Sequence, residues 1–355
     1  MLIHSRFSIK QAFDCAIGQT LDCLSLRKHK AYFLCFMAMI CINKKIMRLV
    51  KKALFGGSCL LMIALSESSK ATDVTSDSAM KIETIKISNH VCEAEITVKP
   101  FVHLLGFRLL GAKNHLLNIE SPNPSKNGHS MRPLFIVGAK LWYAPEVAGS
   151  HLFGLLTGEV TQKGREVDVN LDRDPGSRLQ GRIRFVLDET KPQLKIISVL
   201  RNEGASARET SCWWPVSFEP GGRMEAAPIP SPSEPAFNYH FWSYSGTASE
   251  PGCKITKTNV VLDLDRPPEA PIFKIGFLGR EIILIKPDCV YRMTILDPPV
   301  DPARNYPHGG SPVMLYCDQK TWFCEAELSG PLIKLQPQEE TSFIFTISLE
   351  PSPKG

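Results

Sequence analysis

Residues 342–349 have the sequence SFIFTISL, and this stretch decides the fold class. Its apolar side chains at Phe343, Phe345, Ile347 and Leu349 alternate with mostly polar ones, the period-two pattern of a strand with one buried face. The same alternation recurs in CEAEITVK at residues 92–99 and in EVDVNL at residues 166–171. Short apolar runs bounded by turn residues predict further strands at residues 183–187, 194–200, 260–264, 282–285 and 314–316.

Beyond residue 72 the chain has no amphipathic helix longer than about three turns and no strand–helix–strand rhythm. Many strands joined by short turns predict an all-β protein, built as one large antiparallel β-sandwich. Stretches rich in Pro and Gly at 122–128, 220–235 and 298–312 are predicted to be long surface loops, of the kind that borders a site. A domain break at 220–235 is the alternative, but strands of the same character continue on both sides.

The composition is that of an ordered globular protein, with 43% hydrophobic and 22% charged residues in a chain of 355. The formal net charge of +5 is unevenly distributed, because residues 1–71 hold eleven Lys or Arg and only three Asp or Glu. The rest of the chain is therefore mildly acidic, which removes the compositional support for nucleic-acid binding.

The basic segment has the organisation of a signal peptide. From Met47 the chain runs MRLVKK, then the apolar ALFGGSCLLMIAL, then SESSKA, with small residues at Ser69 and Ala71 before the predicted cleavage point. We therefore expect residues 1–46 to be an upstream extension before a true start at Met47, and residues 47–71 to be a signal peptide. The apolar run is too short to span a bilayer, so the mature chain is expected in the periplasm or outside the cell without a stable membrane span. A longer leader or a membrane anchor is the alternative, and a lipoprotein attached through Cys59 is weaker, because the apolar run continues past the cysteine.

Residues 72–90 are expected to be a flexible lead-in, and residues 91–350 the domain. Six cysteines follow the predicted cleavage point: Cys92, Cys212, Cys253, Cys289, Cys317 and Cys324. An even number in an exported chain permits disulfides, but the pairing is open, and buried thiols in a large core are an equal alternative. Because CxxC, HExxH, GxGxxG, Walker A and GxSxG motifs are all absent, the sequence predicts no metal site and no cofactor.

The segment FCEAELS at residues 323–329 carries two acidic residues at strand spacing. On a strand, Glu325 and Glu327 share one face about 7 Å apart, while Cys324, Ala326 and Leu328 form an apolar opposite face. Like charges at this spacing raise each other's pKa, which suits a general base. Glu325 is the preferred base with Glu327 as its neighbour, and a solvated strand face is the alternative.

The C-terminal region resembles the closing strands of galactose mutarotase-like proteins. Those proteins have an E-x-E/Q strand, a proline a few residues later, then L-x-P-G-E and a final apolar strand. The counterparts are Glu325-Ala326-Glu327, Pro331 and the segment LQPQE at 335–339, in which Gln338 replaces the usual glycine.

Two earlier stretches are similar to the same family, so that the resemblance extends in order over roughly residues 91–350. The segment from Pro100 to Leu116 resembles the opening P-x-x-G-G-R … G-x-N-L, with Phe107 in place of the second glycine. GAKLWYAPE at 138–146 and FKIG at 273–276 are similar to an uncharacterised branch of exported bacterial members.

The resemblance implies a twisted β-supersandwich whose concave face binds a sugar. In enzymatic members, a strand glutamate accepts the proton of the anomeric hydroxyl while a histidine protonates the ring oxygen. Seven histidines follow residue 71: His90, His103, His115, His129, His151, His240 and His308. His240 is the candidate acid because it lies among aromatic residues in NYHFW, although none of the seven has the sequence context expected of a mutarotase histidine.

Substrate contacts are predicted from aromatic and basic side chains. Tryptophan rings stack on the C–H faces of sugars, which nominates Trp142, Trp214 and Trp242, although most tryptophans are core residues. The family-like stretches add Arg108, Asn114, Lys140 and Lys274, which can donate to hydroxyls or to a carboxylate.

Together these features predict an exported carbohydrate-binding protein. It is either a sugar epimerase or mutarotase using a strand glutamate as base, or a non-catalytic carbohydrate-binding, structural or interaction protein. No histidine has the sequence context of a mutarotase histidine, which favours the non-catalytic protein over a simple aldose mutarotase. The paired carboxylates keep the enzyme open as an alternative.

Overall fold

The computed structural model describes residues 82–118, 136–147, 149–230, 238–243, 253–265, 272–318 and 323–352. The chain divides into two units, Met1–Asp77 and Ser78–Gly355, and all described residues belong to the second. The predicted upstream extension, signal peptide and first part of the lead-in lie outside them. Among the described residues, no helix is long and apolar enough to cross a membrane.

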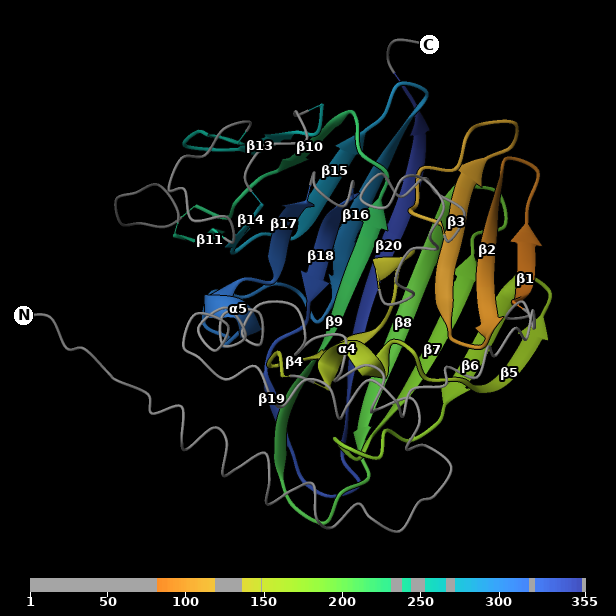
Figure 1. Cartoon of the computed structure of the whole chain (residues 1–355), viewed down its shortest axis with the longest axis vertical. Coiled ribbons are helices and arrows are strands. Elements are labelled where there is room, and N and C mark those ends of the chain that lie inside the picture. The colour runs from red at the N-terminus through yellow and green to blue at the C-terminus, as the bar shows by residue number, and fades with distance from the viewer. Residues whose placement is uncertain are drawn as a thin grey trace, which may run out of the picture. The chain divides into compact units, whose positions relative to one another are not determined.

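The largest of the three described sheets contains ten antiparallel strands (Figure 1). In spatial order these are β12 (Cys253–Ile255), β13 (Val260–Asp263), β10 (Arg223–Ala226), β15 (Glu281–Ile285), β16 (Cys289–Asp297), β20 (Glu340–Pro351), β8 (Gln193–Asn202), β7 (Leu179–Leu187), β6 (Glu166–Leu171) and β5 (Gly158–Lys163).

A second sheet has seven described strands. Six follow the order β11 (Tyr239–Ser243), β14 (Phe273–Phe277), β17 (Val313–Asp318), β18 (Phe323–Ser329), β9 (Arg208–Phe218) and β19 (Ile333–Leu335), while β4 (Trp142–Ala144) also pairs with β9. The third sheet consists of β1 (Glu83–Ser88), β2 (Cys92–Lys99) and β3 (His103–Leu109). The two described helices, α4 (Ser150–Phe153) and α5 (Pro307–Gly310), are single turns.

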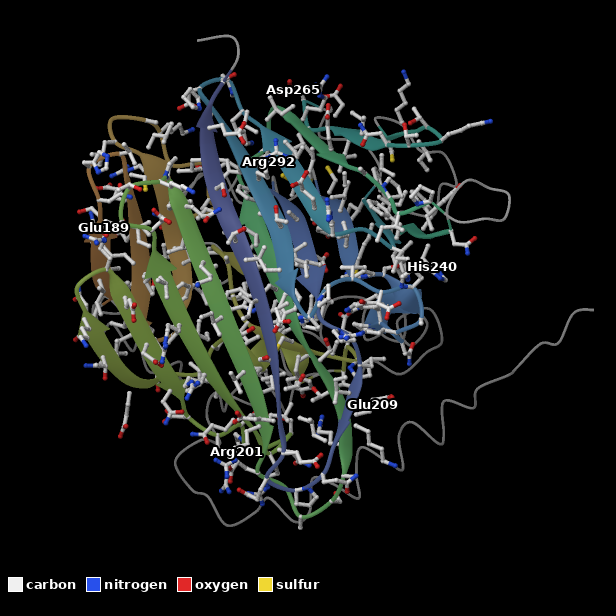
Figure 2. The ribbon with its side chains drawn as sticks, turned by 180° about the vertical axis from the view of Figure 1, so that it is seen from behind. Glu189, Arg201, Glu209, His240, Asp265 and Arg292 are labelled. Carbon is white, nitrogen blue, oxygen red and sulfur yellow. The ribbon has the colours of Figure 1, made fainter. Side chains whose placement is uncertain are left out.

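The seven-stranded and three-stranded sheets together form one layer. Ala139 joins them, because it bridges Leu104 of β3 on one side and Val216 of β9 on the other. Figure 1 shows this layer in front, and Figure 2, from behind, shows the ten-stranded sheet facing the viewer. Buried apolar residues of both layers form one main core, so that the unit is a β-sandwich.

The alternating sequence patterns form strands as predicted. In β20, Phe343, Phe345, Ile347 and Leu349 are buried in the core, and the apolar runs at 183–187, 194–200 and 260–264 lie in β7, β8 and β13 or at their ends. The fold class predicted from the sequence is therefore confirmed.

The structure differs from the sequence prediction at two segments. The strand β1 lies within the expected lead-in at 72–90, where Ile85 and Ile87 form a short apolar face on the core, and Thr84, Lys86 and Ser88 are exposed. Lys99–Glu83 and Lys86–Glu95 ion pairs link it to β2. The expected loop at 220–235 contains β10, which lies between β13 and β15 inside the ten-stranded sheet.

Tyr291 of β16 connects the two layers. It is fully buried, and its hydroxyl donates to the carbonyl oxygen of Phe107 at 2.9 Å and accepts from the backbone N–H of His115 at 3.3 Å. Both backbone groups belong to the front layer, so one phenol oxygen holds this layer against the ten-stranded sheet.

Replacing Tyr291 with Phe should lower the free energy of unfolding by about 1–3 kcal/mol, because it leaves buried backbone groups unsatisfied. Chemical denaturation at neutral pH measures this loss. Tyr239→Phe is the matched control, since this residue is 39% exposed and water can replace its hydroxyl contacts. Equal effects of the two substitutions would contradict the proposed connection.

Candidate functional site

The outer face of the seven-stranded sheet carries the candidate site. Strand register places Glu325 in a row with its cross-strand neighbours Trp242, Lys274, Tyr316 and Ser217. The adjacent row contains Glu327 with His240, Gly276, Met314 and Pro215. Since directly opposed residues point to the same side, these polar and aromatic side chains face away from the core. The apolar partners Cys324, Ala326 and Leu328 lie in the core, as their alternation predicts.

Glu325 is paired with a buried lysine. Lys140 is fully buried, and its Nζ lies 3.0 Å from Oε1 of Glu325. The Ser217 hydroxyl donates to the same oxygen at 2.7 Å and accepts from Lys140 at 2.7 Å. Burial lowers the pKa of Lys140, and the charge of Glu325 opposes that shift. Glu325 is 7% exposed.

Glu327 has a separate set of partners. Its Oε2 accepts from Lys274 at 2.8 Å and from the indole N–H of Trp213 at 2.8 Å. Burial raises the pKa of Glu327, Lys274 lowers it, and the charge of Glu325 raises it further. The ammonium of Lys274 lies 4.9 Å from the ring centre of Trp213 and 5.9 Å from that of Trp242.

The environment of the two carboxylates therefore differs from the one expected from sequence. The sequence suggested two neighbouring acidic groups that raise each other's pKa in front of a ligand. In the structure each carboxylate is buried and has its own lysine, because a buried charge needs a nearby counter-charge and hydrogen bonds. A ligand outside this face would first meet the side chains that cover the pairs.

A layer of aromatic and polar side chains lies over the two ion pairs. The rings of Trp142 and Trp213 are 4.9 Å apart, centre to centre. The ring of His151 packs on Trp142 at 4.3 Å and that of His308 on Trp213 at 4.5 Å, both in tilted arrangements. The exposed Glu146 accepts a hydrogen bond from Nε2 of His151 at 3.0 Å, which lowers the pKa of that carboxyl. The two imidazoles are partly exposed, so this layer is accessible from solvent.

The loop that carries His308 has a restricted backbone. His308 has φ 53° and Gly309 has φ 69°, both in the left-handed region. A side chain at Gly276 would lie 2.8 Å from Ser311, so this glycine lets the segment after α5 approach the sheet. Burial and the nearby Lys274 lower the pKa of His308 to about 3. Its imidazole is therefore neutral at pH 7.

His240 lies at the β11 edge of the same face, beside α5 (Figure 2). Its ring stacks against Trp242 at 5.8 Å, and a side chain at Gly309 would lie 2.6 Å from it. Two strands, β14 and β17, separate β11 from the carboxylate strand β18. At about 4.8 Å per strand, the backbone of His240 lies about 14 Å from that of Glu327 in its own row and farther from that of Glu325, so His240 is a peripheral member of the site.

Three predicted site residues lie elsewhere. Arg108 pairs with Glu93 between β3 and β2. The Asn114 side chain donates to the backbone carbonyl of Leu105 and so supports the turn after β3. Trp214 is fully buried in the core and donates its indole N–H to Ser198, because it alternates with Trp213 and faces the opposite side of β9. The structure brings the other seven together: His240, Glu325, Glu327, Lys140, Trp142, Trp242 and Lys274.

Four residues of the site were not selected from the sequence: Glu146, His151, Trp213 and His308. Glu146 ends the family-like stretch at 138–146, which is the one local signal that pointed to it. Selecting Trp213 requires the pairing of β9 with β18, and placing His308 requires the packing of a loop on a sheet. Neither relation is contained in a local sequence pattern.

One group of potential metal ligands lies outside this face. Donor atoms of His115, Asp288 and Cys289 lie within 4.8 Å of one another, among the residues that the structure describes. The imidazole of His115 is 2.5 Å from Asp288, and Lys286 and Lys113 lie near it. Their positive charges oppose a divalent cation, so a hydrogen-bonded His–Asp pair explains the group.

Removing one partner of the Lys274–Glu327 pair should strongly destabilise the fold. Lys274→Met leaves a buried carboxylate without its cation, and we expect a loss of about 3–5 kcal/mol in the free energy of unfolding. The double substitution Lys274→Met/Glu327→Gln should recover part of this loss, because it removes both charges. A denaturant series of Lys274→Met, Glu327→Gln and the double variant measures the coupling.

Arg223→Met is the control for the pair, since Arg223 and Glu225 form an exposed ion pair and should contribute less than about 1 kcal/mol. A double variant whose loss equals the sum of the two single losses would show that the lysine and the carboxylate do not interact.

No protein-family model matches the sequence, and no curated protein matches it. Solved structures do match it. A galactose mutarotase-like protein from Lactobacillus casei superposes with a TM-score of 0.53 at 11% identity, covering 76% of this chain and 100% of that one. A TPR-domain-containing protein from Parabacteroides distasonis gives a TM-score of 0.50 at 11% identity, covering 75% of this chain and 46% of that one. A putative aldose 1-epimerase from Escherichia coli K12 gives a TM-score of 0.49 at 12% identity, over 76% and 99% of the two chains.

At identities near one tenth, such a superposition shows similarity of fold alone. The described part of the chain has the galactose mutarotase-like fold.

Proposed function

We propose that this chain is an exported carbohydrate-binding protein, which holds a sugar on the outer face of the seven-stranded sheet. The main support is the layer of aromatic and polar side chains on that face. Trp242, His240, His308 and His151 are partly or fully exposed there, and Glu146 adds an exposed carboxylate. Aromatic faces pack on the C–H faces of sugar rings, while imidazoles and carboxylates bind hydroxyls.

The deeper residues support this layer. Trp213 is 2% exposed and Glu327 is 1% exposed, so neither reaches a ligand directly in this arrangement. Both contact Lys274, and Trp213 also contacts the ring of His308, so they support the positions of these two side chains. We infer that the sugar contacts the outer layer and that the lysine–carboxylate pairs hold this layer in place.

A sugar epimerase or mutarotase is the second candidate. Burial raises the pKa of Glu327, which favours its acceptance of a proton, and His308 is a neutral imidazole on the same face. This reaction requires a substrate that displaces the aromatic and polar side chains over Glu327, or one that reaches Glu327 from the side of Lys274. Because the carboxylates are paired and buried, the geometry supports binding better than catalysis.

Export is part of the proposal and rests on the sequence of residues 47–71. Cleavage after Ala71 would release a chain that begins at Thr72. N-terminal sequencing of the secreted or periplasmic product tests this, and a mature chain that retains residues 47–71 would contradict it.

Calorimetry of the purified full chain against neutral and acidic mono- and oligosaccharides tests the binding site. We expect saturable binding that Trp242→Ala weakens about three- to tenfold, the value of one stacking contact. Arg108→Ala, on the three-stranded sheet, should leave the affinity unchanged and serves as the control. If no sugar binds, or if both variants bind equally well, the proposed site is wrong.

For any sugar that binds, anomer exchange followed by NMR separates the two candidates. Rapid exchange that Glu327→Gln abolishes while the sugar still binds would favour the enzyme. Binding without exchange above the uncatalysed rate would favour the non-catalytic protein.

A further inference from the structure

Two cysteines face each other across the hairpin of β17 and β18. Cys317 and Cys324 are direct partners in the antiparallel register, and Phe273 and Phe218 occupy the flanking positions of the same row. Both cysteines are thiols in the structure, at 0% and 1% exposure. They lie on the core side of the sheet, opposite the face that carries Glu325 and Glu327.

The register of this pair suits a disulfide. Directly opposed residues of antiparallel strands have Cα atoms about 4.5–5.5 Å apart and side chains on the same face, and a disulfide needs about 4.4–6.8 Å between Cα atoms. The Sγ of Cys324 now lies 3.8 Å from the carbonyl oxygen of Phe218, on the side of β9. Rotation about its Cα–Cβ bond turns the sulfur toward β17 without moving the backbone.

No other described cysteine lies directly opposite a cysteine in the strand register. The residues opposite them are Leu109 for Cys92, Tyr143 for Cys212, Leu262 for Cys253 and Pro351 for Cys289. Among the six cysteines that the structure describes, only Cys317 and Cys324 are paired with each other by strand register.

We propose that Cys317 and Cys324 form a cross-strand disulfide when the chain folds in the presence of a disulfide oxidant, such as oxidised glutathione or a protein dithiol catalyst in its oxidised form. One cysteine thiolate attacks the oxidant and forms a mixed disulfide, releasing one oxidant thiol. The second cysteine thiolate then attacks the mixed disulfide and releases the other thiol. The two protein thiols are oxidised and lose their protons, and the oxidant is reduced to two thiols.

Packing fixes the redox state of this pair. In the folded chain the two sulfurs lie between the sheets, out of reach of reagents, and burial raises the pKa of Cys324 to about 12. Little reactive thiolate therefore forms after folding, and thiol–disulfide exchange takes place in the unfolded or partly folded chain. Once the core has packed, the pair keeps the state in which it was folded.

Refolding the full chain in a mixture of reduced and oxidised glutathione tests the proposal. After acid quenching, the remaining thiols are alkylated in denaturant and the chain is digested with trypsin. Cleavage after Arg304, Lys320 and Lys334 places Cys317 in the peptide 305–320 and Cys324 in the peptide 321–334, each with a single cysteine. We expect these two peptides to be joined as the major species, and to separate on reduction.

Two variants control the assignment. Cys324→Ala should abolish the joined species, while Cys92→Ala, which changes another buried cysteine, should leave it intact. Alkylation of both thiols in the refolded wild-type chain, or a link from Cys324 to a different cysteine, would overturn the proposal. Because this readout is a peptide mass, it does not depend on whether the proposed sugar site is correct.

A second measurement tests the protection of the bond. The oxidised chain should resist dithiothreitol under native conditions and be reduced rapidly in denaturant. Rapid reduction of the native chain would overturn the inference that packing fixes the redox state.

Discussion

The front layer of this protein depends on the neutralisation of two carboxylates in a strand that is buried on both faces. All seven residues of β18 are buried, although the alternating sequence FCEAELS supplies only one apolar face. A buried carboxylate without a partner costs several kcal/mol, so the fold must deliver a cation to each. Lys140 arrives from the segment before β4, and Lys274 from β14, on opposite sides of β18. The observed strand order thus supplies a counter-charge to the central strand from each side.

The same constraint decides which side chains a ligand can reach. Both lysines are paired with carboxylates, and Trp142 and Trp213 lie over these pairs. The partly exposed His151 and His308 pack on the two tryptophans. His308 is neutral at pH 7, and Glu146 provides the exposed negative charge next to His151. A protein of mutarotase-like fold thus presents a face of stacking and hydrogen-bonding groups, while its strand carboxylates support the structure. This arrangement explains why the geometry is better suited to binding than to proton transfer by Glu325 or Glu327.

Period-two alternation was sufficient to predict the fold class, because strands such as β20 bury one face and expose the other. It did not reveal β1, whose apolar face consists of only two isoleucines, or β10, which lies in a segment rich in Pro and Gly. Lys140 and Lys274 were selected as ligand-binding residues because they lie in family-like stretches, but their role as partners of Glu325 and Glu327 depends on which strands are neighbours. That order is set by long-range pairing, which no local pattern encodes.

The sequence motif showed only that Gln338 replaces the usual glycine of the family. The structure explains why a glycine suits this position, because Gln338 has a φ of 69°.

Ala139 gives the front layer a further property. It is the residue through which β3 and β9 are joined, by two backbone hydrogen bonds of 2.9 Å to Leu104 and an isolated bridge to Val216. On the β9 side Gly138 and Lys140 add hydrogen bonds to Ser217 and Pro215, whereas the hydrogen bonds to Leu104 on the β3 side all come from Ala139, so the β3 side resists bending less than a full ladder of strand pairs does. The next residue is Lys140, which holds Glu325. Because Ala139 and Lys140 are consecutive, a hinge motion of the three-stranded sheet about Ala139 would also shift the backbone of the lysine that neutralises Glu325.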